Sequence, residues 1–421
     1  MAAFFTCFPR RDGIAAQAFD RRRLLRVEGG RHHVSSHTMS NRLIRHLRRQ
    51  LLIAALASIG TAAHCITIGP GELYRADGPP SWHRITPASQ VRELKVRQPS
   101  PSEEKVIERA RELQAGTAVA AVVLIDGDTV VYSWQRNKDA HVYWGASMGK
   151  SVLSMAIGPA ICDGKLKLTT KVREFVPEAA PFPVADATVR DLLRMASGTT
   201  DETVNAETSS PWTPADNRAL VQGTLTIAQL VLQPRLLVSQ QGLFGAVKPG
   251  DRFSYKSTDP VLLGIVLRRA TGMPYGAWLQ RALFDRMGAE GGGLVEQDSE
   301  GYGLSSAGVR LSLADWQRFA VWVQRVSREQ GCLGDYVRQA MHVQIDNPGP
   351  PAARQFGALF DGYGYFFWVR NRIVSGTTFA SGLGGQRISW HEGSDRMTIF
   401  FSREENWMPQ LYELVRSWNA Q

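Results

Sequence analysis

Ser147 lies where two patterns associated with nucleophilic catalysis overlap. The run 145–149 has the spacing G-x-S-x-G of a nucleophile elbow, and the run 147–150 has the spacing S-x-x-K. Both patterns make the Ser147 hydroxyl the attacking group, but they require different partners. An elbow needs a strand before it, a helix after it, and an aspartate and a histidine later in the chain, for which Asp259 and His391 can be named.

The S-x-x-K pattern needs only one helical turn. If Ser147 opens a helix, Lys150 lies one turn along on the same face. The Ser147 amide is then an unpaired helix-start donor that can face an oxyanion. A desolvated lysine amine can lose its charge and accept the hydroxyl proton. Serine and lysine are common residues, so an ordinary helix start with a solvated lysine is an equally good explanation of this pattern alone.

Tyr255 is a second candidate for proton transfer. It begins the run Tyr255-Lys256-Ser257, just ahead of an apolar helical pattern. Unperturbed tyrosine titrates at about pH 10, and a neighbouring lysine favours the phenolate, which can act as a base toward a serine or a leaving group. The alternatives are a loop aromatic packed at a helix entrance for Tyr255 and a solvated side chain for Lys256.

Strand patterns at both ends of the chain predict one antiparallel sheet. Ser100, Pro101 and Glu103 form a helix-start pattern, and two β-rich runs around Asp126-Gly127-Asp128 predict a hairpin. Near the C-terminus, three strand-like runs over 364–374, 386–390 and 397–402 precede a helix from about Asn406. The region between is mostly helical in pattern, with expected helices from Thr188 and over 259–271, 275–287 and 313–325.

We therefore expect an α+β fold, an α/β sandwich. Its antiparallel sheet is built from N- and C-terminal segments with flanking helices, and a mostly helical subdomain is inserted at about residues 160–345. This order argues against the elbow. An α/β-hydrolase shows repeated strand–helix alternation before its nucleophile, whereas here one helix and one hairpin precede Ser147.

Five stretches in order over about residues 100–421 resemble the serine β-lactamase and penicillin-binding-protein superfamily. The likeness is greatest to its class C β-lactamase-like branch, with its esterases and aminohexanoate-oligomer hydrolases. The stretches are SMGKSV at 147–152, TVRDLLRMASG at 188–198, FSYKSTDPVLLGIVLRRATG at 253–272, LSSAGVRLSLADWQRFA at 304–320 and FASGLGGQRISW at 379–390. The resemblance implies that Ser147 is acylated and that Lys150 and Tyr255 share general-base and proton-shuttle duty. Ser257, where many relatives carry asparagine, would hold the lysine or a polar group of the substrate.

The third motif of that family usually carries Lys-Thr-Gly or His-x-Gly. Here Ala380-Ser381-Gly382 takes its place without a cation. We expect Ser381 and Gly382 to support or bind substrate and the Leu383 N–H to complete the oxyanion hole, although a glycine-rich strand bend explains the run equally well. The cation helps to bind the carboxylate of penicillins, so its absence favours an ester or amide that lacks this carboxylate, unless Arg387 compensates.

Composition and charge exclude several classes of protein. Of 421 residues, 43% are hydrophobic and 21% charged, as in ordinary globular proteins. Residues 1–65 hold eleven arginines and three acidic residues, or +8, and leave +2 of the net +10 for the remainder. A body this close to neutral is not expected to bind nucleic acid. The histidines show no metal-ligand spacing, so no metal or cofactor is expected. Cys162 and Cys332 are expected to be buried thiols, and a disulfide between them after export is the alternative.

The N-terminal region resembles an export signal. Residues 39–64 combine arginines, a short apolar stretch over 51–63 and small residues at 61–63. The apolar stretch is short for a bilayer span, so the protein is expected to be periplasmic or secreted, with an uncleaved membrane anchor as the alternative. Residues 1–38 would be unstructured or a mis-assigned start, 65–100 a linker and 101–421 the hydrolase domain.

These features together predict a serine hydrolase that acts through an acyl-enzyme on ester or amide bonds of small substrates. The alternatives are a β-lactamase or D-amino-acid peptidase, or a non-catalytic sensor of the penicillin-binding type. A sensor would be favoured by the loss of Ser147, Lys150 or Tyr255, and all three are present. The expected partner is a small molecule, with a membrane contacted only through the possible anchor.

Overall fold

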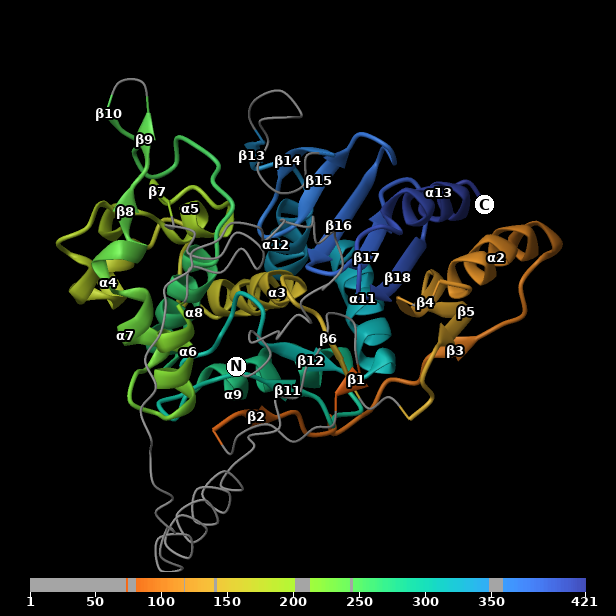
Figure 1. The fold of residues 1–421 in the computed structure, drawn as a ribbon, viewed down its shortest axis with the longest axis horizontal. Helices are drawn as coiled ribbons and strands as arrows, with labels where there is room; N and C mark the ends of the chain where they lie inside the picture. Colours follow the sequence, from red (N-terminus) through yellow and green to blue (C-terminus); the bar gives the residue numbers. More distant parts are fainter. Residues whose placement is uncertain are drawn as a thin grey trace, which may run out of the picture. The chain divides into compact units, whose positions relative to one another are not determined.

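The largest sheet of the computed structural model has nine strands, most of which lie in the right half of the view in Figure 1. The structure describes residues 73–74, 81–116, 118–139, 142–200, 213–242, 245–347 and 359–421. The strand order is β13-β14-β15-β16-β17-β18-β4-β5-β3, and every pairing is antiparallel except that of β3 with β5. The strands span Ile345–Asp346, Phe360–Tyr363, Trp368–Asn371, Thr377–Gly382, Gln386–His391, Arg396–Ser402, Val119–Asp126, Thr129–Gln135 and Lys95–Val96, in that spatial order.

The pairing of β18 with β4 closes this sheet. It runs from Arg396 opposite Asp126 to Ser402 opposite Val119, so the last strand of the chain lies against the first long hairpin. β4 and β5 are the predicted hairpin. β15 lies within the first of the three strand-like runs predicted near the C-terminus, and β17 and β18 match the other two, each with one residue more. The expected α+β architecture is confirmed, because segments from both ends of residues 101–421 form the sheet.

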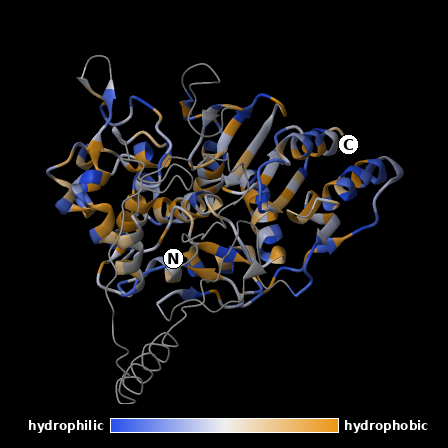
Figure 2. Ribbon diagram, viewed as in Figure 1, coloured by the Kyte–Doolittle hydropathy of each residue, from blue (hydrophilic) through white to orange (hydrophobic). Residues whose placement is uncertain are grey.

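Helices cover both faces of the large sheet. α2 (Pro101–Gln114) and α13 (Met408–Asn419) pack on one face, and α3 (Met148–Cys162), α11 (Leu313–Ser327) and α12 (Cys332–Ala340) pack on the other. α2 begins with the predicted capping box, in which Ser100 and Glu103 bind each other's backbone amides. α3 is buried along almost its whole length and is mostly apolar in Figure 2, as expected for a helix enclosed by other elements.

A second sheet of five strands leads into the nucleophile. Its order is β1-β6-β12-β11-β2, with bounds Leu73–Tyr74, Val142–Trp144, Val309–Leu311, Leu294–Val295 and His83–Arg84. β1, β2 and β3 come from the range expected as a linker, of which the structure describes residues 73–74 and 81–100. β1 pairs with β6, and residues 81–100 lie against the body of the protein, where the Ile85 amide donates to the Gly293 carbonyl and the Ile85 side chain is buried.

The middle of the chain is mostly helical, as expected. Its α-helices are α4 (Val172–Phe175), α5 (Val189–Leu193), α6 (Pro214–Val221), α7 (Ile227–Val231), α8 (Thr258–Thr271), α9 (Tyr275–Leu279) and α10 (Asp285–Met287). A π-helical turn, η5 (Gln280–Phe284), joins α9 to α10, so the predicted helix over 275–287 is helical throughout. Short 3₁₀ turns lie at Pro177–Ala179, Pro183–Asp186 and Pro234–Leu236, and the small strands are β7 (Thr199–Thr200), β8 (Val238–Ser239), β9 (Gln241–Gly242) and β10 (Gly245–Ala246).

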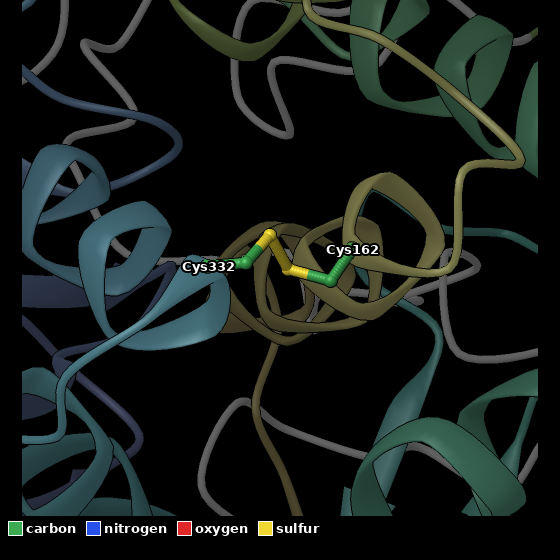
Figure 3. The surroundings of a disulfide bond; sticks show 2 residues. All are labelled: Cys162 and Cys332. Carbon is green, nitrogen blue, oxygen red and sulfur yellow. A yellow bond between two sulfur atoms is a disulfide. The ribbon is translucent and has the colours of Figure 1, made fainter.

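A disulfide joins Cys162, at the end of α3, to Cys332, at the start of α12 (Figure 3). The expectation of buried thiols is therefore wrong, and the alternative of a bridge is the one observed. Cys332 is exposed, and the two Cα atoms lie 5.8 Å apart, within the range of a disulfide. The pairing fixes the C-terminal end of the helix that carries Lys150 to a helix 170 residues away in sequence.

The predictions for residues 1–38 and 39–64 lie outside the described residues. Within the described part of the chain, the search for a helix long and apolar enough to span a bilayer found none.

Candidate active site

A strained turn between β6 and α3 presents Ser147. Ala146 has a φ of 47°, in the left-handed region that non-glycine residues rarely occupy, and such a conformation costs about 1–3 kcal/mol. The turn is held on both sides, because the Gly145 amide donates to the Val309 carbonyl (3.1 Å) and the Gly145 carbonyl accepts from the Met148 amide (3.0 Å). Ser147 thus lies at the N-cap of α3, partly exposed, as the S-x-x-K pattern requires.

Lys150 lies beneath Ser147 and is not solvated. Its side chain is almost fully buried, and its Nζ lies 2.9 Å from Ser147 Oγ and 3.0 Å from the Ser306 carbonyl oxygen. Lys150 forms no ion pair with any residue that the structure describes. The explanation of this pattern as a helix start with a solvated lysine is therefore excluded.

The loop 304–308 fixes the carbonyl that receives Lys150. Trp144 Nε1 donates to the Ala307 carbonyl (2.7 Å), and Ser305 Oγ donates to the Pro260 carbonyl of α8 (2.8 Å). Trp144 is buried and belongs to the core beneath the nucleophile. These contacts tie β6, α3 and α8 to one loop, so the lysine amine has a defined place relative to the serine hydroxyl.

Tyr255 lies beside Lys150, in the segment that leads into α8. The Lys150 Nζ is 5.1 Å from the centre of the Tyr255 ring. The ring packs on Trp368 of β15 (5.1 Å between centroids) and on Tyr363 of β14 (6.2 Å). The structure therefore brings together the three residues predicted as catalytic. Ser257 follows as the N-cap of α8 and is partly exposed.

The end of β16 closes the other side of the site. A Cβ atom at Gly382 would collide with the carbonyl oxygen of Gly145, so this strand abuts the nucleophile turn and only glycine fits. Leu383 follows at the hairpin turn, with 39% of its surface exposed. Within the described part of the chain, neither the Ser147 nor the Leu383 N–H enters a backbone hydrogen bond. Both donors can face an oxyanion at this end of the strand.

Ser381 is not brought to the nucleophile. Successive residues of a strand face opposite sides of the sheet, so Ser381 shares a face with Phe379 and not with Gly382. The Phe379 ring contacts Tyr412 of α13 (5.8 Å), which lies on the sheet face opposite α3. The Ser381 Oγ is buried there and has no hydrogen-bond partner among the residues that the structure describes. Its side chain therefore faces away from Ser147, unlike the predicted supporting role.

His391, one of the two partners that the elbow requires, lies far from Ser147. His391 pairs with Thr377, five positions before Gly382, which places it roughly 17 Å along the strand from the nucleophile turn. Asp259 is held by Lys256 instead, with 3.1 Å between Lys256 Nζ and Asp259 Oδ2. A serine–histidine–aspartate triad is therefore excluded, in agreement with the order of strands and helices.

A comparison with models of protein families identifies the family of this chain. The family model described as Beta-lactamase matches residues 104–408. This chain belongs to the β-lactamase family. No curated protein matches the sequence.

Several solved structures share the fold of this chain at low sequence identity. A candidate 6-aminohexanoate-dimer hydrolase from Bacillus anthracis is 16% identical, with 79% of this chain and 89% of that chain covered and a TM-score of 0.58. EstCE1, a hydrolase with promiscuous acyltransferase activity, is 15% identical, with 75% and 100% covered and a TM-score of 0.56. A class C β-lactamase is 12% identical, with 76% and 96% covered and a TM-score of 0.57. These likenesses establish the fold of a hydrolase family.

This β-lactamase-family site contains a buried ion pair that sequence reasoning missed. Lys256 Nζ lies 3.1 Å from both Asp259 Oδ2 and the Ser254 carbonyl oxygen, and Asp259 Oδ1 accepts from Ser197 Oγ at 2.6 Å. Lys256 is therefore buried and paired, not solvated. The spacing of Lys256 and Asp259 at a helix start was a signal for the pair, but nothing local marked Ser197.

Tyr363 is a further residue that the sequence did not indicate. Burial, together with the neighbouring Tyr255 and Asp259, raises the pKa of Tyr363 well above its usual value of 10. Its phenol therefore stays protonated over the pH range in which hydrolases act, and it adds a neutral hydroxyl group next to Tyr255.

Proposed function

We propose that this β-lactamase-family protein is a serine acyl-hydrolase that cleaves ester or amide bonds of small substrates through an acyl-enzyme. One observation carries the proposal. The buried Lys150 amine is 2.9 Å from the Ser147 hydroxyl, without a carboxylate partner among the described residues, so its polar contacts are directed at the nucleophile and at one carbonyl.

In the acylation step, Ser147 Oγ attacks the substrate carbonyl carbon while its proton passes to Lys150 Nζ. The N–H groups of Ser147 and Leu383 stabilise the oxyanion that forms. As the carbonyl carbon–leaving-group bond breaks, the proton moves by way of Tyr255 to the departing alcohol or amine. Ser147 is left as an ester of the acyl group.

In the deacylation step, a water molecule attacks the acyl carbon and loses its proton to Tyr255 or Lys150. The bond to Ser147 Oγ breaks, the serine recovers a proton, and the acid product leaves. The same two residues therefore act as base in one direction and acid in the other.

The residue at the third motif supports esters and simple amides as substrates. Ala380 is fully buried and provides no cation for a substrate carboxylate. Arg387 does not compensate, because its Nη1 binds the backbone carbonyls of Gly382 and Gln386. Two proteins of similar structure are in keeping with this class, EstCE1, a hydrolase with promiscuous acyltransferase activity, and the candidate 6-aminohexanoate-dimer hydrolase.

Labelling with a fluorophosphonate probe tests the proposal. We expect one adduct by intact mass on the wild type and none on Ser147→Ala. Ser381→Ala is a matched control, because that serine lies close in the fold but faces the opposite side of the sheet, and it should label like the wild type. Absence of an adduct on folded wild-type protein would contradict the proposal. Turnover of p-nitrophenyl esters, anilides and a chromogenic cephalosporin then assigns the bond, with the cephalosporin expected to be the poorest substrate.

We further propose that residues 39–64 direct export. The Cys162–Cys332 disulfide supports this, because such bonds persist in oxidising compartments outside the cytoplasm. The full chain expressed in a bacterium should appear in the periplasmic fraction, with a new N-terminus by mass near residue 64. Retention in the cytoplasm with residues 39–64 intact would contradict export.

A further inference from the structure

We propose that Arg387 and Gln386 are positioning residues for the oxyanion hole. They hold the two carbonyl groups that flank the Leu383 amide and thereby set the direction of its N–H. This inference rests on the proposed function, since it concerns the donor that would face the substrate oxyanion.

The contacts form a clamp around one turn. Arg387 Nη1 donates to the Gly382 carbonyl (2.7 Å) and to the Gln386 carbonyl (2.8 Å). Gln386 Nε2 donates to the Leu383 carbonyl (2.9 Å) and to the Ser402 carbonyl (2.6 Å), and Gln386 Oε1 accepts from the Ser402 amide (3.2 Å). Gln386 is fully buried and anchored to β18, so the turn is tied to the centre of the large sheet.

Because the peptide between Gly382 and Leu383 is planar and trans, the contacts to its carbonyl also set the direction of its N–H. The Gly382 carbonyl and the Leu383 N–H belong to the same planar peptide unit and point in opposite directions. An arginine that fixes the carbonyl therefore fixes the N–H. The described residues contain no cis peptide bond.

The neighbouring glycines explain why a clamp is needed. Gly384 and Gly385 have φ values of 78° and 94°, and Gly382 precedes Leu383, so three glycines surround the donor. Glycine allows many backbone conformations at little cost, which lets a peptide unit between glycines rotate unless other contacts hold it. The glycine at 382 is required by its contact with Gly145, so the rigidity must come from side chains of the next strand.

The charge of Arg387 also strengthens the donor. A guanidinium bound to a carbonyl oxygen polarises the peptide and makes its N–H a better hydrogen-bond donor. Its nearest carboxylate, Glu405, is 3.8 Å from Nη2 and half exposed, whereas the Arg387 side chain is mostly buried. Position 380, where relatives carry a cation, is alanine in this chain, and the nearby positive charge is that of Arg387. This charge acts on the Gly382–Leu383 peptide through the Gly382 carbonyl and does not bind substrate.

Kinetics on the full chain test the inference. For Arg387→Met, kcat for p-nitrophenyl butyrate should fall about 10- to 100-fold. Removal of one oxyanion-hole donor typically lowers kcat about 10²- to 10³-fold, and a misdirected donor should lose part of that effect. KM should change less than about 2-fold, since the donor acts mainly in the transition state. Affinity for benzeneboronic acid, which forms a tetrahedral adduct on a serine, should fall by a factor similar to that in kcat.

Three further variants keep the test decisive. Arg387→Gln retains a polar side chain if the methionine variant unfolds, and Arg387→Lys should be intermediate because an ammonium can bind one carbonyl but lacks the planar fork. Arg370→Met is the control, an exposed arginine of β15 that pairs with Asp346 and should leave kcat unchanged. A folded Arg387 variant with wild-type kcat and wild-type boronic acid affinity overturns the inference alone. A wild type that is neither labelled at Ser147 nor active on esters overturns the proposed function and the inference together.

Discussion

Two lysines, Lys150 and Lys256, are buried in the same site and held in opposite ways. Lys256 Nζ contacts the Asp259 carboxylate, whereas Lys150 Nζ contacts the Ser147 hydroxyl and a backbone carbonyl. Buried charges in proteins are normally paired, because an unpaired one is costly. The comparison distinguishes a lysine paired with a carboxylate from a lysine in contact with a serine hydroxyl, to which we assign the proton transfer, although both are buried lysines near the start of a helix.

Removal of the Lys150 amine should have the largest effect on activity. Lys150→Met should lower the rate of Ser147 labelling and of ester hydrolysis about 10²- to 10⁴-fold, the range of general acid–base catalysis. Its melting temperature should stay within a few degrees of the wild type, because no carboxylate is left unpaired and methionine fills most of the volume.

Lys150→Arg distinguishes a base from a charge at this position. Arginine keeps the positive charge but cannot give up its proton in a protein. We expect it to be nearly as inactive as the methionine variant. Activity within about 3-fold of the wild type would show that Lys150 acts only through its charge, contrary to the proposed proton transfer.

Removal of the Lys256 amine should lower the stability of the protein, whereas removal of the Lys150 amine should lower mainly its activity. Lys256→Met removes the cation that pairs with the buried Asp259 carboxylate, and breaking a buried ion pair in this way typically costs about 3–5 kcal/mol of unfolding free energy. Lys256→Met combined with Asp259→Asn should recover much of this loss. Urea unfolding measures both, and Lys165→Met, at an exposed lysine, is the control with no expected change.

The same variant also tests whether the ion pair positions Tyr255. At conditions where each protein is folded, Lys256→Met should slow labelling of Ser147 about 10-fold. Asp315→Asn provides a matched comparison, because it weakens a buried pair with Arg318 on α11, and it should destabilise the protein without slowing labelling per folded molecule. Equal slowing by both variants would mean that the ion pair affects only stability.

The parts of the site that the sequence could predict are those encoded within one helical turn or one strand. Ser147 and Lys150 are three residues apart at a helix start, so their contact follows from helix geometry. The capping box at Ser100 and the hairpin at Asp126-Gly127-Asp128 are equally local, and the structure has both.

The parts that could not be predicted depend on distant partners or on strand register. The partners of Asp259 include Ser197, 62 residues earlier, and the disulfide joins cysteines 170 residues apart. The face that Ser381 presents depends on the register of β16, because a shift of one residue exchanges the two faces of a strand. The role of Arg387 depends on a hairpin turn whose glycines permit several shapes, so its carbonyl partners are visible only in the folded chain.

The smallest expected effect concerns Tyr363, whose ring packs beside that of Tyr255. The question is whether the Tyr363 hydroxyl takes part in proton transfer. Burial and the neighbouring Tyr255 and Asp259 raise the pKa of Tyr363, so its neutral form persists above pH 10. A group whose pKa lies above the working range contributes no inflection to a pH–rate profile. Tyr363→Phe should therefore lower kcat/KM at most about 10-fold, through the loss of one hydroxyl, while both limbs of the profile between pH 5 and 10 keep their midpoints. A shift of the alkaline midpoint by more than about half a pH unit would mean that Tyr363 takes part in the proton transfer that we assign to Lys150 and Tyr255.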